Sequence, residues 1–211
     1  MKKLHEINKT DEDKFKQLVS GEAKKHSTSQ KRNVTKQKSS EDYLKNIAKK
    51  LVFECFKNSK NVLCIGCRHE AELFLFEKHG LNVEGIDPAI QTNKIKQAPA
   101  EKMLEFFKED QFDFIYASHS LEHVVIPEKV MGNIRKVAKS GCYIILPVII
   151  RDTPKIGHPT LYDICKQSQN STKEALLISI KEDFKMFEPY NVEDIFYIDG
   201  HEPEFHICLK W

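Results

Sequence analysis

The sequence has no apolar run near the length that a membrane-spanning helix needs, which is about 20 residues. Its first residues, MKKLHEINKTDEDKFK, lack the apolar stretch of a secretory signal. The mean hydropathy is −0.48 and aromatic residues make up 9% of the chain. We therefore expect a soluble, cytoplasmic protein without a membrane span.

The chain also lacks the cysteine pattern of a zinc site. Its six cysteines are scattered, and Cys64 with Cys67 forms a C-x-x-C pair that has no second pair at ligand spacing. Cys64 falls inside an apolar run, whereas a redox pair belongs at the start of a helix. We expect reduced thiols in the core, and no metal.

Residues 1–38 contain few apolar side chains, so this part of the chain has little to bury. Residues 1–40 hold 11 Lys and Arg against 5 Asp and Glu, a net charge of +6, whereas the whole chain carries +2. The basic cluster at residues 24–38 fits an arm attracted to the phosphates of a nucleic acid, but it lacks aromatic residues for base stacking. We favour a solvated tail. The predicted organisation is a flexible basic extension, residues 1–38, followed by one domain, residues 39–211.

The stretch from Lys60 to Asp87 organises that domain. A short apolar run, Val62 to Ile65, ends at Gly66, and a second run, Val83 to Ile86, ends at Asp87. Between them lies a segment of helix length closed by Gly80. The pattern predicts two buried parallel strands joined by a helix, which place Gly66 and Asp87 at the carboxyl edge of one sheet. A nucleotide-like ligand binds at such an edge, with an acid accepting from ribose hydroxyls.

The remaining elements alternate between helix and strand periodicity. Helices are predicted at Ser39–Lys57, Ala100–Lys108, Ile126–Lys139 and Ser171–Phe187. Strands are predicted at Ile95–Ala98, Phe112–Ala117, Tyr143–Ile150, Val192–Ile198 and Phe205–Trp211. The last two are expected to form an antiparallel hairpin. The long irregular connection at residues 151–171 is of a kind that is usually functional.

This order resembles the class I S-adenosylmethionine-dependent methyltransferases, in particular the small type 11 branch, over residues 40–211. The resemblance rests on VLCIGC, on VEGID, on FDFIYASHSLEHV, and on the helix, glycine turn and apolar strand that follow it. It implies an α/β, Rossmann-like three-layer sandwich, with a mostly parallel seven-stranded sheet and a C-terminal antiparallel hairpin. The implied cofactor is S-adenosyl-L-methionine.

The glycine turn departs from the family pattern, because Gly66-Cys67-Arg68-His69-Glu70 stands in place of G-x-G-x-G and Cys64 replaces an acid. Arg68 is then a candidate for the methionyl carboxylate and Glu72 for the α-amino group. The alternative is that these side chains form a surface ion pair that caps the helix. The resemblance implies cofactor contacts from strand ends and turns, at Ile65, Gly66, Cys67, Arg68, Glu72, Asp87, Pro88, Ala100, Glu101, Ser118 and His119.

Methyl transfer needs an aligned nucleophile and, for some acceptors, a base. His119, just past the strand Phe112–Ala117, is the first candidate for that base, and His158 in the long connection is the second. The alternative for His119 is a loop histidine bonded to backbone. His123 and Glu122 are expected to line the site or to fix its loop.

The leading functional hypothesis is transfer of a methyl group to an O, N or S atom of a small-molecule or saccharide-type acceptor. One alternative is an RNA or protein methyltransferase that uses the basic arm. The absence of an N/D-P-P-Y motif argues against methylation of base amino groups in nucleic acid. Another alternative is a non-catalytic relative that binds a nucleotide or a partner, because two of the three glycines are missing.

Overall fold

The computed structural model describes residues 56–67, 70–147, 191–198 and 204–211. Several predictions fall wholly or mostly outside these residues: the extension 1–38, the helices Ser39–Lys57 and Ser171–Phe187, the connection 151–171 with His158, and Arg68. The boundary between extension and domain therefore stays a prediction.

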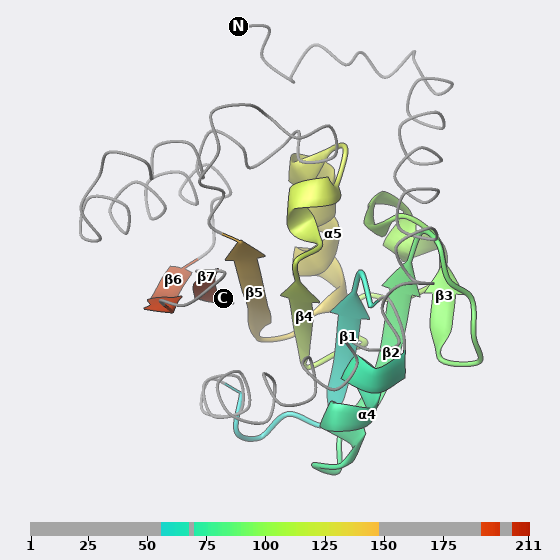
Figure 1. Cartoon of the computed structure of the whole chain (residues 1–211), viewed down its shortest axis with the longest axis horizontal. Coiled ribbons are helices and arrows are strands. Elements are labelled where there is room, and N and C mark those ends of the chain that lie inside the picture. The colour runs from blue at the N-terminus through green and yellow to red at the C-terminus, as the bar shows by residue number, and fades with distance from the viewer. Residues whose placement is uncertain (1–55, 68–69, 148–190, 199–203) are drawn as a thin grey trace, which may run out of the picture.

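Seven strands form one sheet in the order β3-β2-β1-β4-β5-β7-β6 (Figure 1). Neighbours from β3 to β5 pair in parallel, whereas β7 pairs antiparallel with both β5 and β6. The predicted mostly parallel sheet with an antiparallel end is confirmed. The strands are β1 (Asn61–Ile65), β2 (Asn82–Asp87), β3 (Ile95–Gln97), β4 (Phe114–Ser118), β5 (Gly141–Pro147), β6 (Asn191–Ile198) and β7 (Glu204–Lys210).

The strand order reverses direction beside β1. From β1 the chain moves outward through β2 to β3, then returns to place β4 on the other side of β1. In open parallel sheets this reversal leaves a crevice outside the carboxyl ends of the strands, where ligands bind. The fold therefore predicts a ligand site at the carboxyl ends of β1, β2 and β4.

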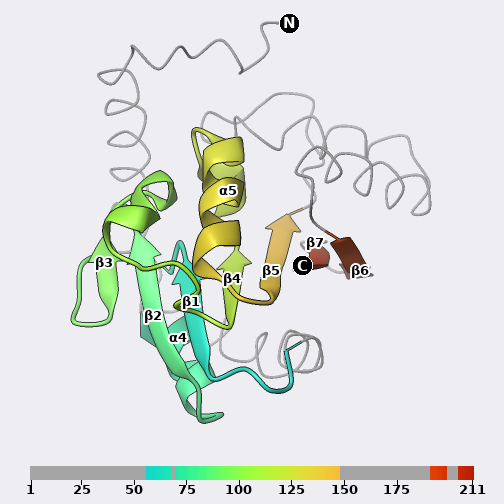
Figure 2. The ribbon, with the colours of Figure 1, turned by 180° about the vertical axis from the view of Figure 1, so that it is seen from behind.

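Helices cover both faces of the sheet, as the two opposite views show (Figures 1 and 2). The helix α4 (Glu70–Glu77) joins β1 to β2, and α5 (Pro127–Val137) joins β4 to β5. A 3₁₀ helix, η3 (Ala100–Glu105), follows β3, and a short one, η4 (Leu121–His123), follows β4. No helix in the described part of the chain is long and apolar enough to cross a membrane.

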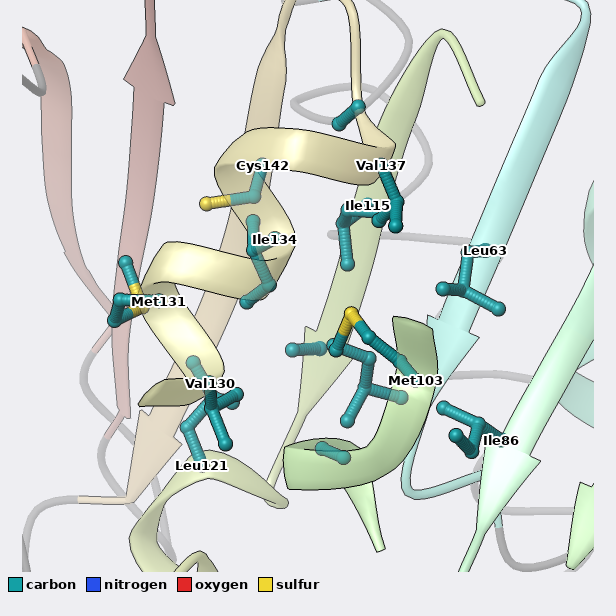
Figure 3. Packing of buried hydrophobic residues seen from close by; sticks show 14 of the residues in the cluster. Leu63, Ile86, Met103, Ile115, Leu121, Val130, Met131, Ile134, Val137 and Cys142 are labelled. Atoms are coloured by element: carbon teal, nitrogen blue, oxygen red, sulfur yellow. The ribbon is translucent and has the colours of Figure 1, made fainter. Parts of the chain in front are cut away.

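The two faces of the sheet have different cores. On the α5 side the core is largely aliphatic, with Val130, Ile134 and Val137 of the helix packed over Leu63 and Ile115 (Figure 3). On the α4 side it is rich in aromatic rings and thiols, and the rings of Phe56 and Phe114 stack at 4.3 Å between centroids. The strands carry apolar side chains on both faces, which is why they appear in the sequence as continuous apolar runs.

A carboxylate fixes the amino edge of the sheet. Asp113 accepts hydrogen bonds from the backbone N–H groups of Lys60 (2.6 Å) and Asn61 (2.9 Å), and the Lys139 ammonium lies 3.2 Å from it. Partial burial alone would raise the pKa of Asp113, but these donors outweigh it and the pKa is lowered. The start of β1 is thereby held against the residue that precedes β4.

One local prediction needed correction. The predicted helix Ala100–Lys108 is a 3₁₀ helix that ends at Glu105. Its apolar residues do not share one face, since Met103 and Phe107 are buried while Leu104 and Phe106 are exposed. In α4, Leu73 and Phe76 pack into the core, whereas Phe74 is 48% exposed. The Lys78 ammonium lies 4.3 Å from the Phe74 ring centroid, a cation–π contact at the surface.

Candidate functional site

A pocket opens at the carboxyl ends of β1, β2 and β4, where the strand order reverses. Its empty volume, open mouth included, is about 620 Å³. It is lined by strand ends and by the turns that follow them, at Ile65, Gly66, Ile86, Asp87, Pro88, Pro99, Ala100, Glu101, His119, Ser120, His123, Val124 and Val125.

Gly66 forms the turn after β1 and brings it against the loop after β4. Its φ is +71°, a left-handed conformation that favours glycine. A Cβ at this position would lie 2.3 Å from the Cβ of Ser120, and the Gly66 N–H donates to the Ile86 carbonyl at 2.8 Å. The absent side chain is what allows the ends of β1 and β4 to approach one another here.

Asp87, the last residue of β2, lies in the same pocket. Its side chain is 5% exposed, and its Oδ1 accepts a hydrogen bond from the Ala89 N–H at 2.7 Å. That bond forms an Asx-type turn that fixes the carboxylate at the strand end. The structure thus brings Gly66 and Asp87 together in one cleft, the juxtaposition on which the ligand-binding prediction depends.

Glu101 holds the wall of the pocket on the η3 side. Its Oε1 accepts from the backbone N–H groups of Val125 (2.7 Å) and Ile126 (3.1 Å), and its side chain is 3% exposed. The Asn133 amide of α5 donates to the Glu101 carbonyl at 3.0 Å. One carboxylate oxygen therefore accepts hydrogen bonds from two backbone N–H groups just before α5, where the first N–H groups of a helix have no partner within the helix.

His119 is strained at the edge of the pocket. Its φ is +49°, uncommon for a residue other than glycine, and its backbone N–H donates to the Ile145 carbonyl of β5 at 3.0 Å. The strained residue lines the pocket together with His123 of η4. Backbone strain of this kind clusters at functional sites, where the surroundings hold it in place.

Cys67 points away from the pocket. It is fully buried in the core on the α4 side, and a Cβ added at Gly85 would lie 2.3 Å from its Sγ. The glycine of β2 therefore leaves the space that this thiol fills. Burial, and secondarily the carboxylates of Glu72 and Asp87, raises the pKa of Cys67, so the thiol stays neutral.

The other cysteines in the described part of the chain support the core-thiol interpretation. Cys64, Cys142 and Cys208 are free and buried, as Cys67 is. Within the same described residues, no group of three or more His, Cys, Asp or Glu side chains could hold a metal ion. Cys55 and Cys165 lie outside them.

The predicted site residues divide into three groups. Seven of them line the pocket: Ile65, Gly66, Asp87, Pro88, Ala100, Glu101 and His119. Cys67, Glu72 and Ser118 are described but do not line it. Glu72 lies near the core on the α4 side, where its charge adds to burial in raising the pKa of Cys64 and Tyr116. Arg68 and His158 are outside the described residues, and Glu70 is exposed.

The sequence interpretation did not assign several lining residues to the site. These are Ile86, Pro99, Ser120, Val124 and Val125. Ser120 follows directly from the strand-end rule, because it lies two residues beyond β4 at the carboxyl edge. Val124 and Val125 have no such signal, because they lie beyond the strand end, in a segment whose Val125 N–H donates to Glu101, 24 residues away in the sequence.

Comparison with known proteins identifies related sequences. A family model described as a methyltransferase domain matches residues 36–188. An uncharacterized protein of Methanocaldococcus jannaschii is 32% identical over 89 residues, which are 42% of this chain and 42% of that protein. The matching part therefore spans less than half of that relative.

Solved structures share the fold at low identity. A 1,6-didemethyltoxoflavin-N1-methyltransferase from Burkholderia thailandensis aligns over 94% of this chain and 89% of its own, with TM-score 0.58 and 12% identity. A SAM-dependent methyltransferase from Aquifex aeolicus aligns over 83% and 97%, with TM-score 0.51 and 14% identity. A 16S rRNA (adenine(1408)-N(1))-methyltransferase from Catenulisporales acidiphilia aligns over 72% and 84%, with TM-score 0.50 and 17% identity.

Proposed function

Because the chain belongs to the methyltransferase domain family, we propose that it transfers a methyl group from S-adenosylmethionine to an O, N or S atom of a small-molecule acceptor. The observation that carries this proposal is the convergence of Gly66, Asp87 and Ala100 on one pocket at the switch point of the sheet. A nucleoside binds in that position in parallel α/β sheets. The toxoflavin-type methyltransferase, whose structure contains S-adenosylhomocysteine, supports the choice of a small acceptor.

The residues present fit such a cofactor. Asp87 offers a buried carboxylate for ribose hydroxyls, and the turn at Gly66 lines the same pocket. Ser120 carries a buried hydroxyl in the pocket wall that has no hydrogen-bond partner among the described residues. When bound, S-adenosylmethionine supplies an electrophilic methyl group on a sulfonium centre.

The chain's own residues bind and orient the cofactor, and one of them takes up a proton. Asp87 and the turn at Gly66 fix the nucleoside end, while Glu101 holds the Val124–Val125 wall in place. His119, at the β4 edge of the pocket, accepts the proton of the acceptor where the acceptor must lose one. Its backbone N–H bond to Ile145 keeps that imidazole on a fixed loop.

Calorimetric titration with S-adenosylmethionine and S-adenosylhomocysteine tests the proposal. Asp87→Ala is expected to weaken both affinities about tenfold or more, as the loss of a charge-assisted hydrogen bond implies. Asp87→Asn keeps an acceptor oxygen and is expected to lose less. Unchanged affinity in Asp87→Ala would show that the carboxylate has another role, and no binding by the unmodified chain would favour a non-catalytic relative.

A second candidate acceptor is RNA. The basic cluster at residues 24–38 and the fold shared with an rRNA methyltransferase favour it. Removing residues 1–38 and measuring RNA affinity at two salt concentrations separates the two acceptors. A salt-dependent affinity that disappears with the segment would support RNA, because phosphate contacts release counterions.

A further inference from the structure

The chain from η3 to Asp110 runs beside α5 on one face of the sheet (Figure 2). The Asn133 amide of α5 donates to the Glu101 carbonyl at 3.0 Å, and the Asp110 N–H donates to the Lys136 carbonyl at 2.9 Å. These two bonds hold the segment against the helix. We call residues 102–110 the acidic strip, and the exposed side of α5 within residues 128–136 the basic strip.

The two strips carry opposite net charge. The acidic strip has three acids and two bases, a net charge of −1: Glu105, Glu109, Asp110, Lys102 and Lys108. The basic strip has one acid and three bases, a net charge of +2: Glu128, Lys129, Arg135 and Lys136. Lys102 lies 3.7 Å from Glu105, and the Arg135 guanidinium lies 4.9 Å from the Trp211 ring centroid. Four of the other side chains form no ion pair among the described residues: Lys129, Lys136, Glu109 and Asp110.

The acidic strip also exposes two large apolar side chains. Leu104 is 40% exposed and Phe106 is 44% exposed, whereas their neighbours Met103 and Phe107 are buried in the core. Single apolar residues on a surface are ordinary, but two together with polar side chains around them are typical of a protein–protein contact.

Gly132 lies in the middle of the basic strip, three residues after Lys129 and four before Lys136. Side chains at this spacing share one side of a helix. A Cβ at Gly132 would meet nothing within 4 Å, so no contact within the described part of the chain requires glycine here. Glycine in a helix interior lowers stability relative to alanine. Close approach of another surface to the helix would explain the absent side chain.

We propose that the two strips form the contact surface between two copies of this chain related by a twofold axis. In such a dimer the same patch of both copies is in contact, so the patch must be complementary to itself. The basic strip of each copy faces the acidic strip of the other, which meets this condition twice. Leu104 and Phe106 of both copies supply the apolar contact area, and Gly132 lets the facing segment approach α5.

An RNA partner fits this surface less well. Its phosphates would be attracted to Lys129 and Lys136 but repelled by Glu109 and Asp110. The residues of both strips lie outside the lining of the pocket. The dimer therefore does not depend on the cofactor, and its test is separate from that of the proposed function.

Sedimentation velocity of the full chain over a concentration series tests the dimer. The unmodified chain is expected to show a reversible equilibrium between monomer and dimer. Phe106→Ser is expected to raise the dissociation constant about tenfold or more, as the loss of an aromatic contact residue implies. Leu104→Ser is a second, independent variant with an expected effect in the same direction. Phe74→Ser is the matched control and should change nothing, because Phe74 is 48% exposed on α4, which covers the other face of the sheet.

A charge exchange tests the pairing of the strips. Lys129→Glu with Lys136→Glu makes both strips acidic, whereas Glu109→Lys with Asp110→Asn makes both basic. Asparagine is chosen because the Asp110 φ is +53°, a conformation that asparagine tolerates. Each double variant alone is expected to dimerise about tenfold more weakly, because like charges then face one another. An equimolar mixture of the two is expected to form a heterodimer, since each surface meets its opposite.

A monomer at every concentration up to about 100 μM would overturn the proposal. A dimer that Phe106→Ser and both charge variants leave unchanged would overturn it as well, since another surface would then form the contact. RNA affinity, measured by fluorescence polarisation, is the third measurement. A monomer in which the lysine substitutions weaken RNA binding and the acid substitutions strengthen it would assign this surface to RNA instead.

Discussion

The turn after β1 and the loop after β4 are adjacent parts of one pocket wall, yet they are held in different ways. The turn is shaped by missing atoms: Gly66 has no side chain where Ser120 approaches it, and Gly85 leaves space for Cys67. The loop is held by an additional group, because the Glu101 carboxylate accepts hydrogen bonds from the backbone N–H groups of Val125 and Ile126, which follow the loop.

This contrast explains how the chain tolerates a turn with a single glycine. The side chain of Cys67 does not enter the pocket, because the fold accommodates it in the core on the opposite side. The space at Gly85 of β2 thus takes over part of what a second glycine in the turn would provide. The contrast also predicts opposite responses to substitution. Adding side-chain atoms in the turn should destabilise the protein, whereas in the loop the destabilising change should be the removal of the Glu101 carboxylate.

Gly66→Ala should have the largest effect. The new Cβ would lie 2.3 Å from the Ser120 Cβ, in a backbone conformation that is strained for alanine. Strain and overpacking together imply a loss of about 3 kcal/mol in the free energy of unfolding. Denaturant unfolding measures this, and cofactor affinity should fall with it because the turn and the loop must move apart.

Gly80→Ala is the matched control for that experiment. Its φ of +79° is similar, but a Cβ there meets nothing within 4 Å. The expected loss is about 1 kcal/mol, from backbone strain alone. Equal losses in the two variants would mean that the contact with Ser120 does not limit the turn.

Glu101→Ala should have the next largest effect on stability. It removes the acceptor from the Val125 and Ile126 N–H groups, which lie at the entrance to α5. An unsatisfied buried donor costs about 1–3 kcal/mol, so a loss of about 2 kcal/mol is expected. Hydrogen exchange should show the Val125 amide losing protection before the amides of β4 do.

Glu101→Gln distinguishes the roles of Glu101. The amide oxygen of Gln still accepts from the same N–H groups, so the expected loss of stability is less than half of that in Glu101→Ala. If Gln lowered cofactor affinity as far as Ala while keeping stability, Glu101 would contact the ligand directly. That outcome would contradict the assignment of Glu101 to the wall.

Much of the fold was accessible from the sequence because buried parallel strands leave continuous apolar runs. Val62–Ile65 and Val83–Ile86 predicted β1 and β2 closely, and both ends at the pocket followed from them. The helix predicted at Ala100–Lys108 is present but shorter, as a 3₁₀ helix that ends at Glu105. Its apolar spacing is helical, but only Met103 and Phe107 of its four large apolar residues are buried, while Leu104 and Phe106 are exposed.

The sequence predicted the residues of the candidate site only where the ends of strands form it. The pocket includes Gly66, Asp87 and His119 because each lies at or just beyond the carboxyl end of a strand. The direction of Cys67 depends on Gly85, and the partners of Glu101 lie 24 and 25 residues away. Contacts of that range leave no local pattern, so composition and periodicity do not reveal them.

The packing of Cys67 over Gly85 provides the smallest predicted effect and the most direct test of the contrast. Gly85→Ala would place a Cβ 2.3 Å from the Cys67 Sγ and 3.0 Å from the Ile95 Cγ1. The thiol is the end of a short side chain and can shift slightly, so a loss of about 1 kcal/mol is expected. Gly132→Ala, in open space on α5, is the control and should be neutral or stabilising.

The double variant Cys67→Ala with Gly85→Ala decides whether the two positions act as a pair. Removing the Sγ makes room for the new Cβ, so the double variant should be more stable than the sum of the single losses implies. Denaturant unfolding of all four proteins in the cycle gives the coupling energy. Strict additivity would show that Gly85 does not make room for Cys67. The turn would then owe its non-glycine residues to some other feature of the fold.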